Sequence, residues 1–214
     1  MTSPTPSAQP SEPDQEDRVF RSSTGIAGGV FLLLLVAFFG GDAIVRGAGR
    51  TPWLTLAVLI MIVPLIVAFS IRPAVYANEL RLRVRNPFRT ITLPWGTVAD
   101  VRAGYSSEVM THDGGRYQLW AVPVSLRQRK RAARKAATAS QDDPHGRTSA
   151  TADVTDIKAR YAPADKTVAD LRDMSERLGG RAETAGEAQV RWAYEVIAPA
   201  VVGLVLLVIL IATG

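Results

Sequence analysis

Three long runs of apolar residues dominate the hydrophobic pattern of this chain. They are Gly25–Ile44, Trp53–Ile71 and Val196–Ala212, and Asp42 is the one charged residue within them. An α-helix rises about 1.5 Å per residue, so about 20 apolar residues cross the roughly 30 Å hydrocarbon core of a bilayer. The sequence therefore predicts three transmembrane helices, over residues 24–45, 52–71 and 194–213.

Two other interpretations of these runs are weaker. A signal peptide has an apolar segment of roughly 7–15 residues, whereas the first run is longer and a second run follows it at once. A helix buried in a soluble core is the alternative for each run, and the length of the runs disfavours it. We place Asp42 at the water interface, where a carboxylate is tolerated, rather than in a functional role inside the membrane.

Small residues and one proline predict how these helices pack. Pro64 is expected to loosen or kink the second helix, because proline lacks a backbone N–H and its ring clashes with the preceding turn. The first helix has two pairs of small residues four positions apart, which allow a neighbouring helix to approach closely. These pairs are Gly25 with Gly29 and Ala37 with Gly41.

Residues 72–125 show the alternation of short β-strands. In Leu80–Arg85, apolar residues alternate with three arginines, which gives one apolar and one basic face. Arg89–Trp95 has Ile91, Leu93 and Trp95 on one face and two threonines on the other. Further strands are expected over residues 74–77, 97–103 and 116–122. Turn signals at residues 86–87 and 112–115 and the short connections predict an antiparallel sheet.

One amphipathic helix is expected after these strands, over Asp165–Leu178. Val168, Leu171, Met174 and Leu178 recur at helical spacing, and two glycines follow. The predicted fold class is therefore three transmembrane helices plus an α+β cytoplasmic domain. In that domain, an antiparallel sheet or barrel over residues 72–180 is capped by one C-terminal helix.

Two polar segments lie outside this core. Residues 1–23 are predicted to be a disordered tail, because prolines and small polar residues dominate the segment and cannot build a core. Residues 126–160 are predicted to be a flexible basic insertion between the last predicted strand and the helix.

Arginines near the ends of the apolar runs predict the orientation, because arginine-rich loops remain cytoplasmic. With a cytoplasmic N-terminus, ten arginines lie inside: Arg18, Arg21, Arg72, Arg81, Arg83, Arg85, Arg89, Arg177, Arg181 and Arg191. Arg46 and Arg50 lie outside. We therefore expect a multi-pass plasma-membrane protein with its N-terminus and residues 72–195 in the cytoplasm and its C-terminus outside.

Composition narrows the chemistry further. The 214 residues include no cysteine and two histidines, and they carry a net charge of +5. Without cysteine there are no disulfides or thiolate sites, and the histidines are far apart in the sequence. No zinc-protease, phosphate-loop or serine-hydrolase motif is present. We therefore expect no catalytic residue, no metal, no cofactor and no enzymatic activity.

The segment from Arg72 to Ala103 resembles a known family. Its turn at Asn78-Glu79, its basic strand ending in Arg85-Asn86-Pro87 and the hairpin leading to Pro94-Trp95 are similar to the bacterial pleckstrin-homology-like (PH-like) domain of actinobacterial membrane proteins. That group is named after low-molecular-weight protein antigen 6. The resemblance extends to a strand at residues 119–121 and to the helix at 165–178. It implies a fold more than an activity.

The basic residues of this region carry the functional hypothesis, because cations near a membrane are attracted to anionic lipids. The candidate contacts are Arg81, Arg83, Arg85, Arg89, Arg127, Arg129, Lys130, Arg131, Arg134 and Lys135. The alternative is that these residues only orient the chain in the membrane. Alternating arginines on a strand suggest a flat stripe without a pocket, and hence weak, salt-sensitive binding that does not select one headgroup.

Two functions follow from these features. The first is an interaction module that binds the lipid bilayer surface or a membrane or cytoplasmic protein, with a homo-oligomer left open and nucleic acid not expected. The second is an accessory subunit of a membrane transport or sensing complex, in which the transmembrane helices carry the role.

Overall fold

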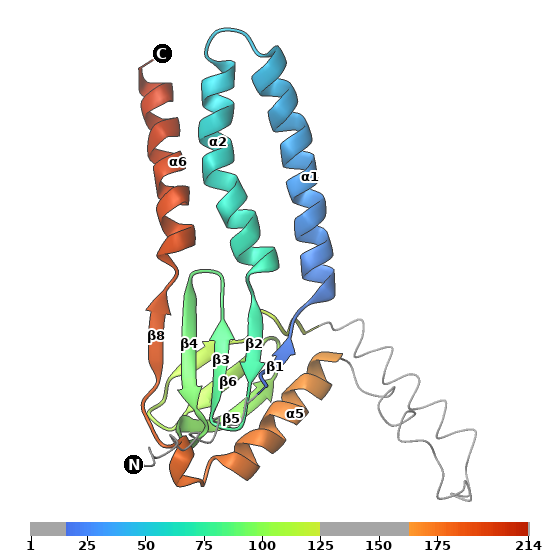
Figure 1. Cartoon of the computed structure of the whole chain (residues 1–214), viewed down its shortest axis with the longest axis vertical. Helices are drawn as coiled ribbons and strands as arrows, with labels where there is room; N and C mark the ends of the chain where they lie inside the picture. Colours follow the sequence, from blue (N-terminus) through green and yellow to red (C-terminus); the bar gives the residue numbers. More distant parts are fainter. Residues whose placement is uncertain (1–15, 125–162, 214) are drawn as a thin grey trace, which may run out of the picture.

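The computed structural model describes residues 16–124 and 163–213 (Figure 1). Three long helices run side by side from one end of a β-rich domain. They are α1 (Ser23–Arg46), α2 (Thr51–Ile66) with a π-helical turn (Val67–Ile71), and α6 (Tyr194–Ala212). Each is long and apolar enough to cross a membrane, and each matches its predicted bounds to within one residue.

Small residues bring α2 close to both of its neighbours. A Cβ atom on Gly203 of α6 would lie 2.7 Å from the Cα atom of Met61, so the two backbones touch. Gly29 of α1 lies against Ser70, which confirms the first predicted glycine pair as a packing contact. The second pair is not used in this way, because Gly41 has nothing within 4 Å.

The prediction that Pro64 loosens or kinks the second helix stays a prediction, and an irregular turn lies just after this residue. Helix α2 continues through Pro64, which has no N–H to donate, and gives way to the π-helical turn at Val67. That turn carries the chain out of the helix and directly into the domain.

The described residues of the domain form two antiparallel sheets. The first has the order β1-β2-β3-β4-β8, with β1 (Arg18–Phe20), β2 (Ala74–Ala77), β3 (Arg81–Arg85), β4 (Arg89–Pro94) and β8 (Gln189–Trp192). The second has the order β5-β6-β7, with β5 (Val98–Ala103), β6 (Ser107–Thr111) and β7 (Arg116–Gln118). Short 3-10 turns lie at Trp95–Thr97 and Ala182–Thr184.

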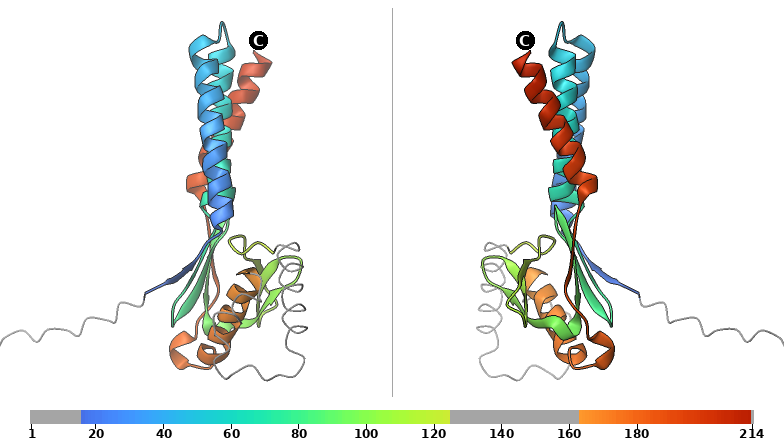
Figure 2. Two further views of the ribbon diagram at one scale, coloured as in Figure 1. Left: turned by 90° about the vertical axis from the view of Figure 1, so that its right-hand side faces the viewer. Right: turned by 90° about the vertical axis from the view of Figure 1, so that its left-hand side faces the viewer.

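Helix α5 (Pro163–Leu178) packs against β5 and covers the core between the sheets (Figure 2). Its four predicted apolar residues are all buried, with Leu171 fully enclosed. The sheets contribute Leu82, Val84, Ile91 and Trp95 among other buried side chains. The predicted amphipathic helix and its packing partner are therefore confirmed.

Three predictions about the domain are wrong. The tail over residues 1–23 was expected to be disordered, yet in its described part Arg18–Phe20 pairs with β2 and Phe20 packs on the core; residues 1–15 lie outside the described residues. The domain was expected to end at residue 180 with a helix, yet β8 follows α5 and pairs with β4. The strand expected over 116–122 ends at Gln118, because Leu119 turns into the core.

The first sheet is joined directly to all three helices. Strand β1 leads into α1, the π-helical turn leads into β2, and β8 leads into α6. The junction is packed by aromatic rings, with Phe69 of the π-helical turn 5.2 Å from Phe88 and 5.5 Å from Trp120 between ring centroids. The position of the sheet is thus fixed relative to the helices.

Candidate functional site

The basic strand β3 has its arginines on the outer face of the first sheet, away from α5. Leu82 and Val84 point into the core, and the alternation places Arg81, Arg83 and Arg85 on the opposite side. In the register of the sheet, Tyr76 and Thr92 flank Arg83, and Thr90 flanks Arg85. The Arg85 end of β3 is the end nearest the three helices (Figure 1).

A pocket of about 290 Å³ opens on this face next to the first turn of α6. It is lined by Arg72, Tyr76, Arg83, Arg85, Thr90 and Glu195. Three of these residues are cationic and one is anionic. The strands β2, β3 and β4 supply one wall, and the junctions with α2 and α6 supply Arg72 and Glu195.

Arg72 forms the buried side of the pocket and is only 8% exposed. Its Nη1 donates to Glu195 Oε1 at 2.6 Å, its Nε to the Asn86 carbonyl at 3.2 Å, and its Nη2 to Thr90 Oγ1 at 3.4 Å. An unpaired buried guanidinium is costly. Glu195 therefore both neutralises Arg72 and fixes its orientation.

Arg83 is held in place from two sides. Its Nη2 donates to Asp17 Oδ2 at 2.9 Å, and its guanidinium lies 4.6 Å from the centre of the Tyr76 ring. Asp17 also accepts a hydrogen bond from Asn78 Nδ2 at 3.0 Å. The residue just before β1 thus reaches the basic face and satisfies one of its arginines.

The pKa of the Tyr76 hydroxyl is affected by the positive charges around the pocket. Arg21 Nη2 donates to its hydroxyl oxygen at 2.9 Å. Partial burial by itself raises the pKa of the Tyr76 hydroxyl, but hydrogen bonding to Arg21 and Arg85 and their positive charges outweigh it. The pKa of Tyr76 is therefore lower than usual. This face favours negative charge.

The structure separates the residues that the sequence had grouped. Arg83 and Arg85 line the pocket, whereas Arg81 is exposed at the other end of β3, opposite Pro94. Arg89 does not share their face, because its guanidinium lies 5.9 Å from the Tyr117 ring of the second sheet. The remaining candidates lie outside the described residues; they are Arg127, Arg129, Lys130, Arg131, Arg134 and Lys135.

The flat-stripe interpretation is therefore wrong for Arg83 and Arg85. Tyr76, Thr90 and Glu195 are parts of the site that no sequence pattern indicated, and Arg72 was expected only to contribute to orientation. Arg72 and Glu195 are 123 positions apart and meet only because the ends of α2 and α6 lie together. No local pattern contains that information.

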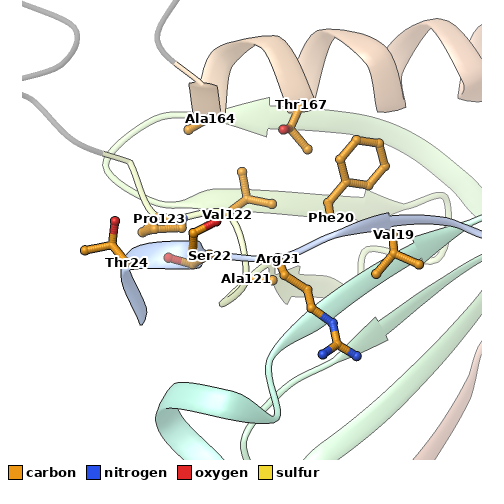
Figure 3. A pocket seen from close by; sticks show the side chains of 11 residues that line it. Val19, Phe20, Arg21, Ser22, Thr24, Ala121, Val122, Pro123, Ala164 and Thr167 are labelled. Carbon is orange, nitrogen blue, oxygen red and sulfur yellow. The ribbon is translucent and has the colours of Figure 1, made fainter. Parts of the chain in front are cut away.

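A second hollow of about 390 Å³ lies between the start of α1, the loop after β7 and the start of α5 (Figure 3). Phe20, Val122 and Ala164 line it together with hydroxyl side chains. The one charged lining residue, Arg21, extends away from Ala164 toward the strands of the first sheet. In the described part of the chain, no three histidine or carboxylate side chains gather as metal ligands.

Comparison with known protein families gives a match, which covers most of the domain. The bacterial PH domain family matches residues 72–201, which cover β2 to β7, α5, β8 and the start of α6 but not β1. The chain belongs to the bacterial PH domain family. No curated protein and no solved structure matched the chain. The PH fold indicates the role of an interaction module. The family match ends inside α6, so Glu195, which lines the pocket, lies within the matched region.

Proposed function

We propose that this bacterial PH domain protein is a multi-pass plasma-membrane protein without enzymatic activity, whose domain contacts anionic lipid headgroups of the adjoining leaflet. In this arrangement α1, α2 and α6 cross the bilayer, and the domain and N-terminus are cytoplasmic. The excess of arginines at the domain ends of the helices supports that orientation.

The observation that carries this proposal is the place of the basic pocket. Arg72 and Glu195 lie at the junctions with α2 and α6, so the pocket is held at the level where headgroups begin. A cation near an anionic leaflet contributes about 1 kcal/mol. Because the helices fix the distance, the arginines reach the headgroups without any recruitment step.

The test uses the full chain in detergent with equal amounts of phosphatidylglycerol, which is anionic, and phosphatidylcholine, which is zwitterionic. Native mass spectrometry counts the lipids that remain bound. We expect phosphatidylglycerol to be enriched, and the enrichment to fall with added salt, because the Debye length shortens from about 8 Å at physiological ionic strength to about 3 Å at 1 M.

A matched pair of variants locates the effect. Replacing both Arg83 and Arg85 with glutamine should remove most of the enrichment. Replacing Arg46 with glutamine removes a charge at the opposite end of α1, where the side chain is exposed and pairs with Asp42, and should leave the enrichment unchanged. Equal retention of the two lipids by the unaltered chain at low salt would overturn the proposal.

A further inference from the structure

The pocket differs from a simple basic surface in how its arginines are paired. Arg72 and Arg83 each already hold a carboxylate oxygen, from Glu195 at 2.6 Å and from Asp17 at 2.9 Å. Arg85 lines the same pocket, and among the described residues it forms no ion pair. Among the described residues, Arg85 is therefore the pocket cation with no carboxylate in ion-pair contact; it hydrogen-bonds the Tyr76 hydroxyl, and its charge also acts on Glu195.

The charges around the pocket leave a defined excess. Four guanidinium groups line it or bond to its lining, from Arg21, Arg72, Arg83 and Arg85. Two carboxylates, Asp17 and Glu195, oppose them. The excess of two positive charges matches a phosphomonoester, which carries about −1.5 to −2 at pH 7.

The size of the pocket and its surroundings fit the same ligand. Its volume of about 290 Å³ leaves room for a phosphate group in a hollow that opens to the solvent. The first turn of α6 borders it, and a helix N-terminus favours anions. Arg72 is pre-oriented by Glu195, which reduces the entropy lost on binding.

We propose that this pocket binds one phosphomonoester group, with Arg85 as the principal donor and Arg72 and Arg83 on either side. The inference rests on the proposed function for the position of the pocket at the leaflet, and it adds selectivity for a phosphomonoester over a phosphodiester. The monoester comes either from a lipid such as phosphatidic acid or from a soluble phosphate.

The test compares phosphatidic acid, a monoester, with phosphatidylglycerol, a diester, on the full chain in detergent. We expect phosphatidic acid to be retained preferentially and to resist added salt better. Arg85→Gln should lower its retention by about tenfold or more, as expected for the loss of a charge-assisted hydrogen bond. Arg81→Gln removes the same charge from the same face of β3 but outside the pocket, and should have a small effect.

A variant that binds phosphatidic acid more tightly than the unaltered chain cannot owe that change to misfolding. Asp17→Asn frees Arg83 from its carboxylate, so phosphatidic acid should bind more tightly than to the unaltered chain. Competition with inorganic phosphate distinguishes a soluble phosphate ligand from a lipid. If inorganic phosphate displaces phosphatidic acid at low concentration, the pocket recognises the phosphate group alone. If only the lipid binds, its acyl chains contribute to binding.

The two proposals fail differently. If Arg81→Gln and Arg85→Gln reduce retention equally, and phosphatidic acid binds no better than phosphatidylglycerol, the pocket is not selective although the lipid-facing role stands. If neither anionic lipid is enriched over phosphatidylcholine and inorganic phosphate does not bind, both proposals are overturned.

Discussion

Gly203→Ala provides a direct test of the packing between α2 and α6. The new methyl group would lie 2.7 Å from Met61 Cα and 2.8 Å from the carbonyl carbon of Ile60, whereas carbon atoms in contact lie about 3.5–4.0 Å apart. Both are backbone atoms, so no side-chain rotation relieves the clash. The helices must separate by about 1 Å, and overpacking of this kind costs about 1–3 kcal/mol.

Gly41→Ala is the matched control, because nothing lies within 4 Å of that site. Replacing glycine with alanine inside a helix favours the helix by up to about 1 kcal/mol, and this gain is common to both variants. We therefore expect Gly203→Ala to be less stable than Gly41→Ala by about 1–3 kcal/mol. Unfolding in mixed micelles of increasing sodium dodecyl sulfate content, followed by circular dichroism, measures the difference. Equal midpoints for the two variants would refute the close approach of α2 and α6.

Three further predictions test the orientation and the domain. A reporter inserted between α5 and β8 should read cytoplasmic and one in the loop between α1 and α2 external; the reverse result contradicts the orientation. Leu171→Ala, at a fully buried site, should cost the domain about 2.7–5 kcal/mol by thermal unfolding, and an unchanged melting curve would contradict the packing of α5. Hydrogen bonds from Arg102 and Arg172 lower the pKa of Asp100. The ionised Asp100 carboxylate therefore stabilises the domain at neutral pH, and this stabilisation is lost below about pH 4. In melting curves recorded at several pH values, Arg172→Ala should reduce the loss of stability in acid.

The sequence predicts the elements whose patterns are long or strictly periodic. The three apolar helices and the stripe of α5 are of this kind, because hydrophobic periodicity over several turns is a strong signal. Strands β1 and β8 have only three and four residues, and every residue of β8 is exposed. Their pairing with β2 and β4 is a tertiary contact that no local pattern records.

The site could be predicted only in part. The alternation in β3 correctly places Arg83 and Arg85 on one face, away from the core. The same alternation in β4 contains the signal that Arg89 lies on the other face, because it has the parity of Ile91. The pocket itself depends on how the ends of α2 and α6 converge, which only the folded chain reveals.

The order of the strands in the first sheet constrains how the protein is made. Strand β1 precedes the first helix and lies at one edge, whereas β8 immediately precedes α6 and lies at the other. The sheet therefore cannot be completed until the ribosome has synthesised residues 189–192. Until then β4 has an unpaired edge, which can bind other strands. The sheet is thus completed by the residues that directly precede α6, so its last strand and this helix are synthesised one after the other.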